Sequence, residues 1–324
     1  MKKIAFFLGK GGVGKTTISS AVAYQFAKEG KRVLIVSLDP AHNLGDVFQK
    51  SLANTPRSLD ANLEGMEIDL AVWVEKYLKE SREEIKANYM YQSAFSVDAY
   101  IDILKYSPGT EEYAVLWAIE YVYKEYGGRC DLIIFDTPPT ALTLRFLAMP
   151  SITRLWVREL SRLREKILQK RQTILRINPK ASIVRNLSEE TEDAQDEPKV
   201  RGAAKKEDDL IYTKLSSIAS RLAELQRLFS HESYLAVVVN PDTLSVAEAL
   251  RIRQELGKLD VRLNSICLNK TTEGGEGRQN VEKNFGDCPV FATGLRQGGI
   301  GEVSQLAEIQ AGGLKNDMKR FGQE

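Results

Sequence analysis

The sequence predicts an α/β fold: a mostly parallel sheet flanked by helices, with an inserted α-helical subdomain. Short apolar runs rich in β-branched residues alternate with helical patterns along the 324 residues, which is typical of a parallel sheet covered on both faces. Two longer helical stretches, within about 70–126 and 150–230, interrupt this alternation. We therefore expect one domain over residues 1–324, with a helical subdomain formed by these two stretches.

The strands are expected where apolar runs are bounded by Asp, Asn, Pro or Gly. The first 40 residues predict a βαβ unit: a strand over 3–8, a glycine-rich loop over 9–15, a helix over 16–29 and a second strand over 33–38. Gly30 follows the helix as its C-cap. Further strands are expected over 132–135, 235–239 and 266–268.

The second helical stretch contains two amphipathic helices separated by an acidic segment. Apolar residues recur at helical spacing in a first helix, and a second helix is expected over 211–229. Those of the first helix are Ile152, Trp156, Leu160, Leu163 and Ile167. Residues 186–209 begin with many acidic and no basic side chains, and such a segment cannot bury enough apolar surface to offset its ordering entropy. We expect a mobile acidic loop there.

The charge and cysteine content narrow the class of protein. The 45 basic and 44 acidic residues nearly cancel, which argues against a global polyanion-binding surface, so no nucleic-acid partner is expected. No apolar run approaches the roughly 18 residues of a transmembrane helix. Cys130, Cys267 and Cys288 are far apart, which indicates a reducing compartment without a disulfide framework. We expect a cytoplasmic protein.

The loop after the first strand has the phosphate-binding pattern GxxxxGK[ST]. Residues 9–16 read GKGGVGKT, between a predicted strand and a predicted helix. The glycines allow backbone N–H groups to surround phosphates, and the helix N-terminus adds its positive dipole end. Lys15 is expected to reach the β- and γ-phosphates and Thr16 to bind Mg²⁺. This pattern predicts a P-loop NTPase whose nucleotide-binding residues include Gly11, Gly12, Val13, Gly14, Lys15, Thr16 and Thr17.

Two aspartates end strands beside this loop. Asp39 follows the second strand and Asp136 follows the run over 132–135. Ligands of open α/β sheets bind at the carboxyl ends of parallel strands, so both carboxylates are expected to face the phosphates. Asp39 can orient or deprotonate the attacking water, and Asp136 suits the Mg²⁺ shell. We predict an ATPase whose Mg²⁺ is held, partly through water, by Thr16, Asp39 and Asp136.

Three segments together resemble the ArsA-type ATPases. KGGVGKTT, SLDPAHNLGDVF and DTPPTALTLRFLAMP are similar to the phosphate loop, switch I and switch II of that family. The family comprises the arsenite-efflux ATPase and the cytosolic ATPase that delivers tail-anchored proteins to membranes. Asn240-Pro241-Asp242 resembles its adenine-reading segment, and Pro289-Val290-Phe291 with the residues that follow resembles its base-flanking loop.

The resemblance implies roles for individual residues. Asp39 activates water, Lys15 binds phosphate, and Lys10, the extra lysine of a deviant Walker A motif, contacts the nucleotide of the facing subunit in a homodimer. Asn240, Pro289 and Phe291 contact the adenine. Residues 150–230 form the client- or effector-facing surface, to which Trp156, Leu160 and Leu163 are assigned.

The sequence departs from the family in two places. Ala141 and Leu142 stand where switch II usually carries a glycine and a histidine. The targeting ATPases commonly fasten their dimer with zinc on a CxxC pair, which this chain lacks, so no structural zinc is expected.

The favoured function is a homodimeric targeting ATPase whose ATP-driven closure forms a groove for hydrophobic transmembrane segments, with a membrane receptor as a further partner. One alternative is an ATPase that energises arsenite or antimonite export. A second alternative is a spatial regulator similar to the MinD and ParA ATPases, for which membrane or DNA sedimentation with ATP is the discriminating test.

Overall fold

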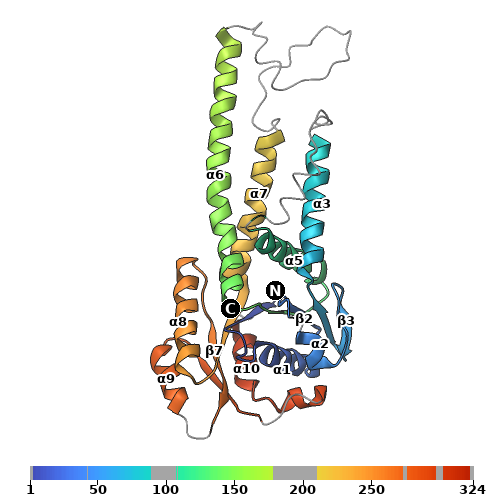
Figure 1. Ribbon diagram of the computed structural model, residues 1–324, viewed down its shortest axis with the longest axis vertical. Coiled ribbons are helices and arrows are strands. Elements are labelled where there is room, and N and C mark those ends of the chain that lie inside the picture. Colours follow the sequence, from blue (N-terminus) through green and yellow to red (C-terminus); the bar gives the residue numbers. More distant parts are fainter. Residues whose placement is uncertain are drawn as a thin grey trace.

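An eight-stranded sheet in the order β3-β4-β2-β5-β1-β6-β7-β8 forms the centre of the chain (Figure 1). The computed structural model describes residues 3–41, 43–88, 107, 109–177, 210–272, 276–296 and 302–321, so the predicted acidic loop over 186–209 lies outside the described residues. The strands are β1 (Lys3–Leu8), β2 (Val33–Ser37), β3 (Arg57–Asp60), β4 (Leu63–Glu67), β5 (Leu132–Asp136), β6 (Ser233–Val239), β7 (Ser265–Thr271) and β8 (Val290–Gly294). The pairings are parallel except that between β3 and β4. The predicted mostly parallel α/β fold is confirmed.

The strands that the sequence did not predict are short or lie near the sheet edges. β3 and β8 are the edge strands, and their side chains are partly exposed, so they lack a continuous apolar run. β4 lies next to β3 and carries Glu64 and Glu67 within five residues. The structure thus adds three strands to those expected.

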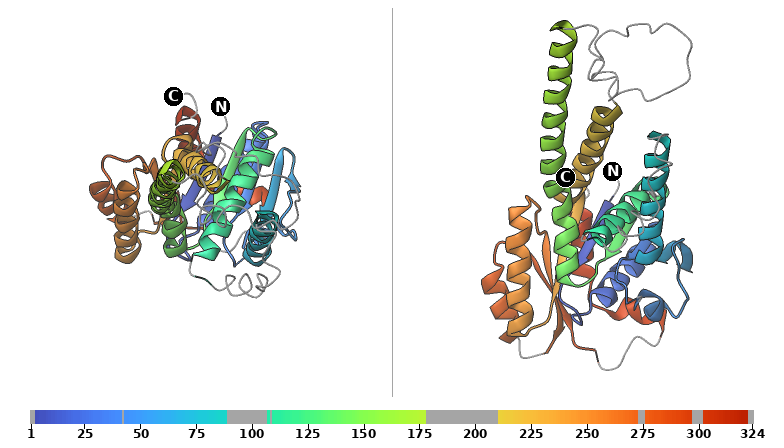
Figure 2. Two further views of the ribbon diagram at one scale, coloured as in Figure 1. Left: turned by 90° about the horizontal axis from the view of Figure 1, so that it is seen from above. Right: turned by 45° about the horizontal axis from the view of Figure 1, so that its top comes forward.

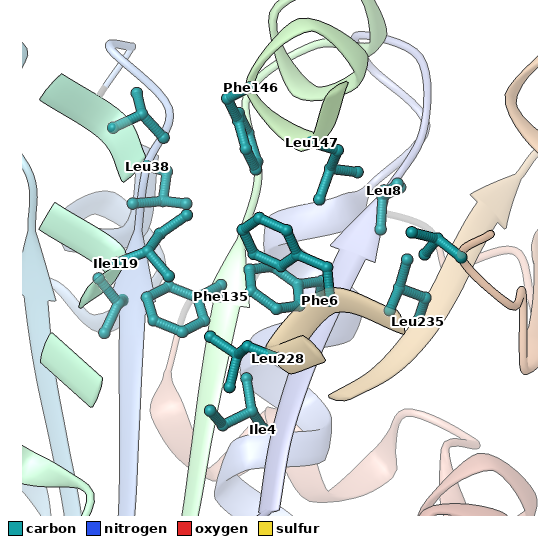
Figure 3. Packing of buried hydrophobic residues seen from close by; sticks show 14 of the residues in the cluster. Ile4, Phe6, Leu8, Leu38, Ile119, Phe135, Phe146, Leu147, Leu228 and Leu235 are labelled. Atoms are coloured by element: carbon teal, nitrogen blue, oxygen red, sulfur yellow. The ribbon is translucent and has the colours of Figure 1, made fainter. Parts of the chain in front are cut away.

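Side chains of the strands alternate between two helical layers. Ala5 and Phe7 of β1 pack with α1 (Lys15–Lys28), α2 (Asn43–Phe48), η5 (Val303–Glu308) and α10 (Gly312–Phe321). Ile4, Phe6 and Leu8 face the opposite layer, which contains α5 (Thr110–Tyr126), η4 (Leu228–Glu232), α8 (Thr243–Lys258) and α9 (Glu276–Asn284). In that layer the rings of Phe6 and Phe135 stack with centroids 4.9 Å apart (Figure 3). The two layers fix β1 and therefore the loop that follows it.

Three helices extend away from the sheet on the α5 side (Figures 1 and 2). They are α3 (Leu70–Asn88), α6 (Thr140–Ile177) and α7 (Leu210–Arg227). We expected the first of the paired helices to begin near 150, but α6 begins ten residues earlier and contains Pro150. Proline removes a helical N–H, yet Phe146 and Leu147 are buried against the sheet layer and hold the helix in place there. Within the described residues, none of the helices has both the length and the apolar character needed to span a bilayer.

A buried ion pair connects the extended helices to the sheet layer. Glu120 of α5 is largely buried and accepts hydrogen bonds from Arg221 of α7 at 3.1 and 3.2 Å and from Lys124 at 2.6 Å. Burial alone would raise the pKa of Glu120, but these two cations outweigh it and lower the pKa below its usual value. The position of α7 over α5 is therefore fixed by charge as well as by packing.

Candidate nucleotide site

The glycine-rich loop connects β1 to α1 at the carboxyl ends of the parallel strands. Gly9, Gly12 and Gly14 have φ values of 146°, 80° and 93°, which side chains with a Cβ rarely adopt. A Cβ at Gly9 would also lie 2.5 Å from the carbonyl oxygen of Val238 in β6. The loop conformation therefore requires glycine at these positions.

Lys15 begins α1 with its side chain folded into the loop. The residue is only 6% exposed, and Nζ donates to the carbonyl oxygen of Lys10 at 3.3 Å. Burial lowers the pKa of Lys15, while the carboxylates of Asp136 and Asp39 oppose that shift. This long hydrogen bond is a weak partner for a buried ammonium, so phosphate oxygens could replace it. The side chain of Lys10 itself is exposed.

Thr16 and Asp136 meet beneath the loop. The Thr16 hydroxyl donates to Oδ2 of Asp136 at 2.6 Å, and Asp136 is fully buried at the end of β5. Burial raises the pKa of Asp136 to about 7, against the opposing effects of the Thr16 hydrogen bond and the Lys15 charge. Its Oδ1 has no hydrogen-bond partner within the described part of the chain.

This pair fits a magnesium ion held together with nucleotide phosphates. Mg²⁺ prefers oxygen ligands and usually takes one or two carboxylates, water and phosphate oxygens rather than a protein cage. The free Oδ1 of Asp136 beside a threonine hydroxyl matches that donor set. No cluster of three or more His, Cys, Asp or Glu side chains suited to a metal occurs among the described residues.

Asp39 lies at the same edge of the sheet. It follows β2, is partly exposed, and its Oδ1 accepts the backbone N–H of Ala41 at 3.0 Å. Ser37 accepts the Asp39 N–H through its hydroxyl oxygen at 3.3 Å, and Ser37 pairs with Asp136 in the register of β2 and β5. The two predicted carboxylates are therefore brought to neighbouring strand ends.

The segment between β5 and α6 is held by its threonines. Thr137 donates through Oγ1 to the carbonyl oxygen of Phe7 at 2.8 Å, and Thr143 donates to that of Pro138 at 2.7 Å. In the two positions that depart from the family, Ala141 is exposed and Leu142 is partly buried in the first turn of α6. The predicted switch II thus continues directly into the long helix.

Three residues were predicted to contact the adenine. Of these, only Asn240 lies at the sheet edge that holds the phosphate loop. Asn240 follows β6, the neighbour of β1, and its buried Oδ1 has no partner within the described residues. Pro289 precedes β8 and so lies at the amino ends of the strands. Phe291 lies within β8 and packs against Gly313 of α10. Leu295, which follows β8, lies at the loop's edge instead, because only residues after a parallel strand reach its carboxyl end.

Two residues that the sequence reasoning missed contact the loop from the end of β7. Asn269 donates through Nδ2 to the carbonyl oxygen of Val13 at 2.8 Å, and Lys270 donates through Nζ to that of Gly12 at 3.0 Å. Both directly follow the predicted strand over 266–268, so their position at a strand end was the available signal. Thr17 is partly buried in the first turn of α1, next to Thr16.

The three residues assigned to a client surface are exposed on α6. The exposed fractions are 67% for Trp156, 48% for Leu160 and 55% for Leu163. Further large apolar side chains on α6 that are more than a third exposed are Ile152, Leu155, Ile167 and Ile177. The helix therefore carries an apolar stripe, defined here as Ile152, Trp156, Leu160, Leu163 and Ile167, that its packing on α7 leaves uncovered within the described residues.

The three thiols lie apart. Cys267 packs in the α1 layer, whereas Cys288 packs in the α5 layer on the other face of the sheet. Cys130 precedes β5, and two strands, β1 and β6, separate β5 from β7. Burial raises the pKa of Cys267 to about 12 and that of Cys288 to about 11. Neither buried thiol is therefore readily available as a thiolate ligand at neutral pH.

Comparisons with known proteins identify a matching family and several similar proteins. The model of a family described as anion-transporting ATPase (ArsA) matches residues 2–293. "Putative arsenical pump-driving ATPase 2" of Aquifex aeolicus is 31% identical over 291 residues, which cover 87% of each chain. "Putative arsenical pump-driving ATPase 1" of the same organism is 35% identical over 173 residues, 52% of this chain and 43% of that protein. "ATPase ASNA1 homolog 1" of Paramecium tetraurelia is 29% identical over 273 residues, 83% of this chain and 74% of that protein.

Proposed function

Since this chain belongs to the family of anion-transporting ATPases, we propose that it is an Mg²⁺-dependent, homodimeric switch that binds the transmembrane segments of tail-anchored proteins. Family membership supports ATP hydrolysis as its activity. The observation that supports client binding is the apolar stripe of α6, which the described residues leave uncovered, because the same helix begins at the nucleotide site. A cytoplasmic setting suits the three free thiols.

The ATPase chemistry follows from the loop and the two strand-end carboxylates. Lys15, freed from the Lys10 carbonyl, would bind the β- and γ-phosphates, and the loop N–H groups would complete their cradle. Thr16 and Asp136 would hold Mg²⁺, which supplies positive charge against the phosphate oxygens when bound. Asp39 would orient the attacking water or accept its proton. Asn240 would contact the adenine through its unpaired Oδ1 or its amide nitrogen.

The dimer proposal rests on Lys10. Lys15 already serves the phosphates within one subunit, whereas the Lys10 side chain is exposed beside the loop. An exposed lysine there can reach a nucleotide in a facing subunit, where it would stabilise charge that develops during phosphoryl transfer. ATP would then bring two subunits together and align their α6 helices.

A hydrophobic client would lie against the stripe. Burying side chains the size of Trp156 and Leu160 on association stabilises a complex by roughly 1.5–3 kcal/mol each. Apolar helical segments commonly dock into hydrophobic grooves, and the stripe would line such a groove once two subunits align their α6 helices. A membrane receptor that collects the client is a further proposed partner.

Copurification tests this proposal. We expect an Asp39→Asn variant, held in the ATP-bound form, to retain a transmembrane-segment peptide over a length-matched polar peptide. Equal retention of both peptides would refute the client proposal and leave the ATPase activity untouched.

Metalloid export is the second candidate, favoured by the names of the two Aquifex relatives. It predicts that arsenite or antimonite stimulates ATP turnover and that Cys→Ser changes remove the stimulation. The placement of Cys267 and Cys288 on opposite faces of the sheet would require a ligand set other than these two thiols together.

A further inference from the structure

A buried glutamate holds the short helix that follows Asp39. Glu67 ends β4, is only 7% exposed, and its Oε1 accepts the backbone N–H of Gly45 at 2.8 Å. Gly45 lies in the first turn of α2, where backbone N–H groups have no carbonyl group of the same helix to bind. The contact therefore supplies an acceptor to the end of α2 that is nearer to Asp39 along the chain.

Glu67 lies in the same row of the sheet as the proposed magnesium ligand. Ser37 of β2 pairs with Glu67 on one side and with Asp136 on the other. Neighbouring strands are about 4.8 Å apart, so the Cα atoms of Glu67 and Asp136 are separated by roughly 10 Å. The hydroxyl oxygen of Ser37 also accepts the backbone N–H of Asp39 at 3.3 Å. Adjacent residues of one row thus hold both Asp39 and the helix that follows it.

Other contacts hold the rest of α2. Leu44 and Phe48 are buried in the α1 layer, and the carbonyl oxygen of Gly45 accepts the backbone N–H of Lys50 at 3.0 Å. Nζ of Lys50 donates to two carbonyl oxygens of β3 at 2.9 Å each. Loss of the Glu67 contact would therefore loosen the first turn of α2 while the helix stays packed on the sheet.

We propose that Glu67 is a positioning residue for ATP hydrolysis. By binding the N–H of Gly45, it fixes the place from which Asp39, six residues earlier, presents its carboxylate to the attacking water. The inference rests on the proposed ATPase chemistry, in which Asp39 orients that water or accepts its proton. A displacement of about 1 Å at a reacting group can lower a rate by about 100-fold, so a loosened first turn should slow turnover. ATP binding should persist, because the phosphate loop belongs to other elements.

Steady-state ATP hydrolysis by three variants tests the inference. Glu67→Met keeps the length of the side chain and removes the acceptor, whereas Glu67→Gln keeps an oxygen that can accept the Gly45 N–H. Glu67→Asp keeps the carboxylate but is one methylene too short to reach Gly45, and it carries the test if the methionine variant does not fold. The control is Glu64→Met, at an exposed glutamate three residues earlier in β4.

The expected result is a split between kcat and KM. Glu67→Met and Glu67→Asp should lower kcat by about tenfold to 100-fold, with KM for ATP within about twofold of wild type. Glu67→Gln and Glu64→Met should have wild-type values of both constants. Wild-type kcat in Glu67→Met and Glu67→Asp would overturn the inference, and so would a rise in KM as large as the fall in kcat.

Combination with Asp39→Asn tests the route of the effect. Asp39→Asn alone should lower turnover by about 100-fold or more. Adding Glu67→Met should then lower the residual single-turnover rate by less than about twofold, because the effects of residues that act as a unit are not additive. A further fall of about tenfold would overturn the inference and leave the proposed role of Asp39 intact. Wild-type turnover in Asp39→Asn would refute that role, and the inference with it.

Amide hydrogen exchange resolved at single residues gives a readout that does not depend on hydrolysis. In the ligand-free chain, the Gly45 N–H should exchange faster in Glu67→Met than in wild type and should keep its protection in Glu67→Gln. The N–H of Phe48 should exchange equally in all variants, because the helix stays packed. Unchanged exchange of Gly45 in Glu67→Met would overturn the inference, whatever the turnover of that variant.

Discussion

Thr16 and Asp136, separated by 120 residues in sequence, share a hydrogen bond of 2.6 Å at the base of the phosphate loop. In the ligand-free chain the two side chains proposed to hold Mg²⁺ therefore bind each other. The Thr16 hydroxyl oxygen keeps its lone pairs while it donates, and Oδ1 of Asp136 has no partner among the described residues, so a cation can bind both oxygens without breaking this hydrogen bond.

Thr16→Val should remove both roles of this hydroxyl, the hydrogen bond to Asp136 and the proposed Mg²⁺ ligand. It leaves the buried Asp136 carboxyl with neither oxygen partnered among the described side chains, which should cost about 1–3 kcal/mol of unfolding free energy. Hydrolysis should fall about 100-fold or more because the Mg²⁺ shell loses an oxygen. Thr16→Ser keeps the hydroxyl and should preserve both properties. Calorimetry and a phosphate-release assay measure the two effects.

Lys15→Ala should abolish tight ATP binding, because the phosphates lose their main point charge. The ligand-free chain should melt no lower than wild type, since the change removes a buried ammonium whose pKa is lowered by burial. Titration calorimetry and a melting curve test the pair of effects. ATP affinity within twofold of wild type would show that the loop does not bind phosphate as proposed.

Lys10→Ala should spare ATP binding but lower hydrolysis by about tenfold or more, because a charge supplied across the dimer acts on the transferring phosphoryl group. Turnover per subunit should also lose its dependence on protein concentration. Lys31→Ala, a change at the opposite edge of the sheet, is the control. Normal hydrolysis by Lys10→Ala would contradict the dimer mechanism.

Trp156→Ser combined with Leu160→Ser should abolish retention of a transmembrane-segment peptide while leaving basal ATP hydrolysis within about twofold, because neither side chain is near the phosphate loop in sequence or structure. Leu244→Ser removes an apolar side chain of α8 that is 63% exposed and serves as the matched control. Peptide crosslinking yield is the measurement. Equal loss in both variants would show that the stripe is not the binding surface.

Arg221→Met should destabilise the chain by about 2 kcal/mol at pH 7, less than the 3–5 kcal/mol typical of a broken buried pair because Lys124 remains and Arg221 is half-exposed. Since the pKa of Glu120 is lowered on folding, this stabilisation is complete above its unfolded pKa of about 4.5 and is lost as the pH falls through the folded value. Denaturant unfolding should therefore show a difference between variant and wild type that shrinks below about pH 4.5. A difference independent of pH would assign the effect to packing.

The sequence was sufficient for the parts of the fold governed by local pattern. The apolar runs of β1 and β2 are fully buried strands, and their glycine-rich connection has a spacing that occurs in few other contexts. The edge strands β3 and β8 could not be predicted in this way. Each pairs with one strand only and its side chains are partly exposed, so its sequence lacks a continuous apolar run.

The residues of the candidate site likewise divide into those that local pattern could place and those that it could not. Asp39 and Asp136 could be placed from the strand that each one ends. The contacts of Asn269 and Lys270 could not, because they depend on the order of strands in the sheet, which a single sequence does not fix. Pro289 was assigned to the adenine by resemblance, but it precedes β8 and so lies at the amino end of that strand, away from the sheet edge that holds the phosphate loop.

Because α6 is one continuous helix from Thr140 to Ile177, a small tilt near its start would move its far end by a larger distance. Phe146 and Leu147 are buried against the sheet layer and would act as the pivot of a tilt, and Trp156 lies about 14 Å along the helix axis from Leu147 at 1.5 Å per residue. A tilt of about 10° about this pivot would therefore displace Trp156 by about 2.4 Å. Since each further turn adds to the arm, Leu163 and Ile167 would sweep farther than Trp156. A rearrangement too small to disturb the core would thus be enough to reshape the distal surface.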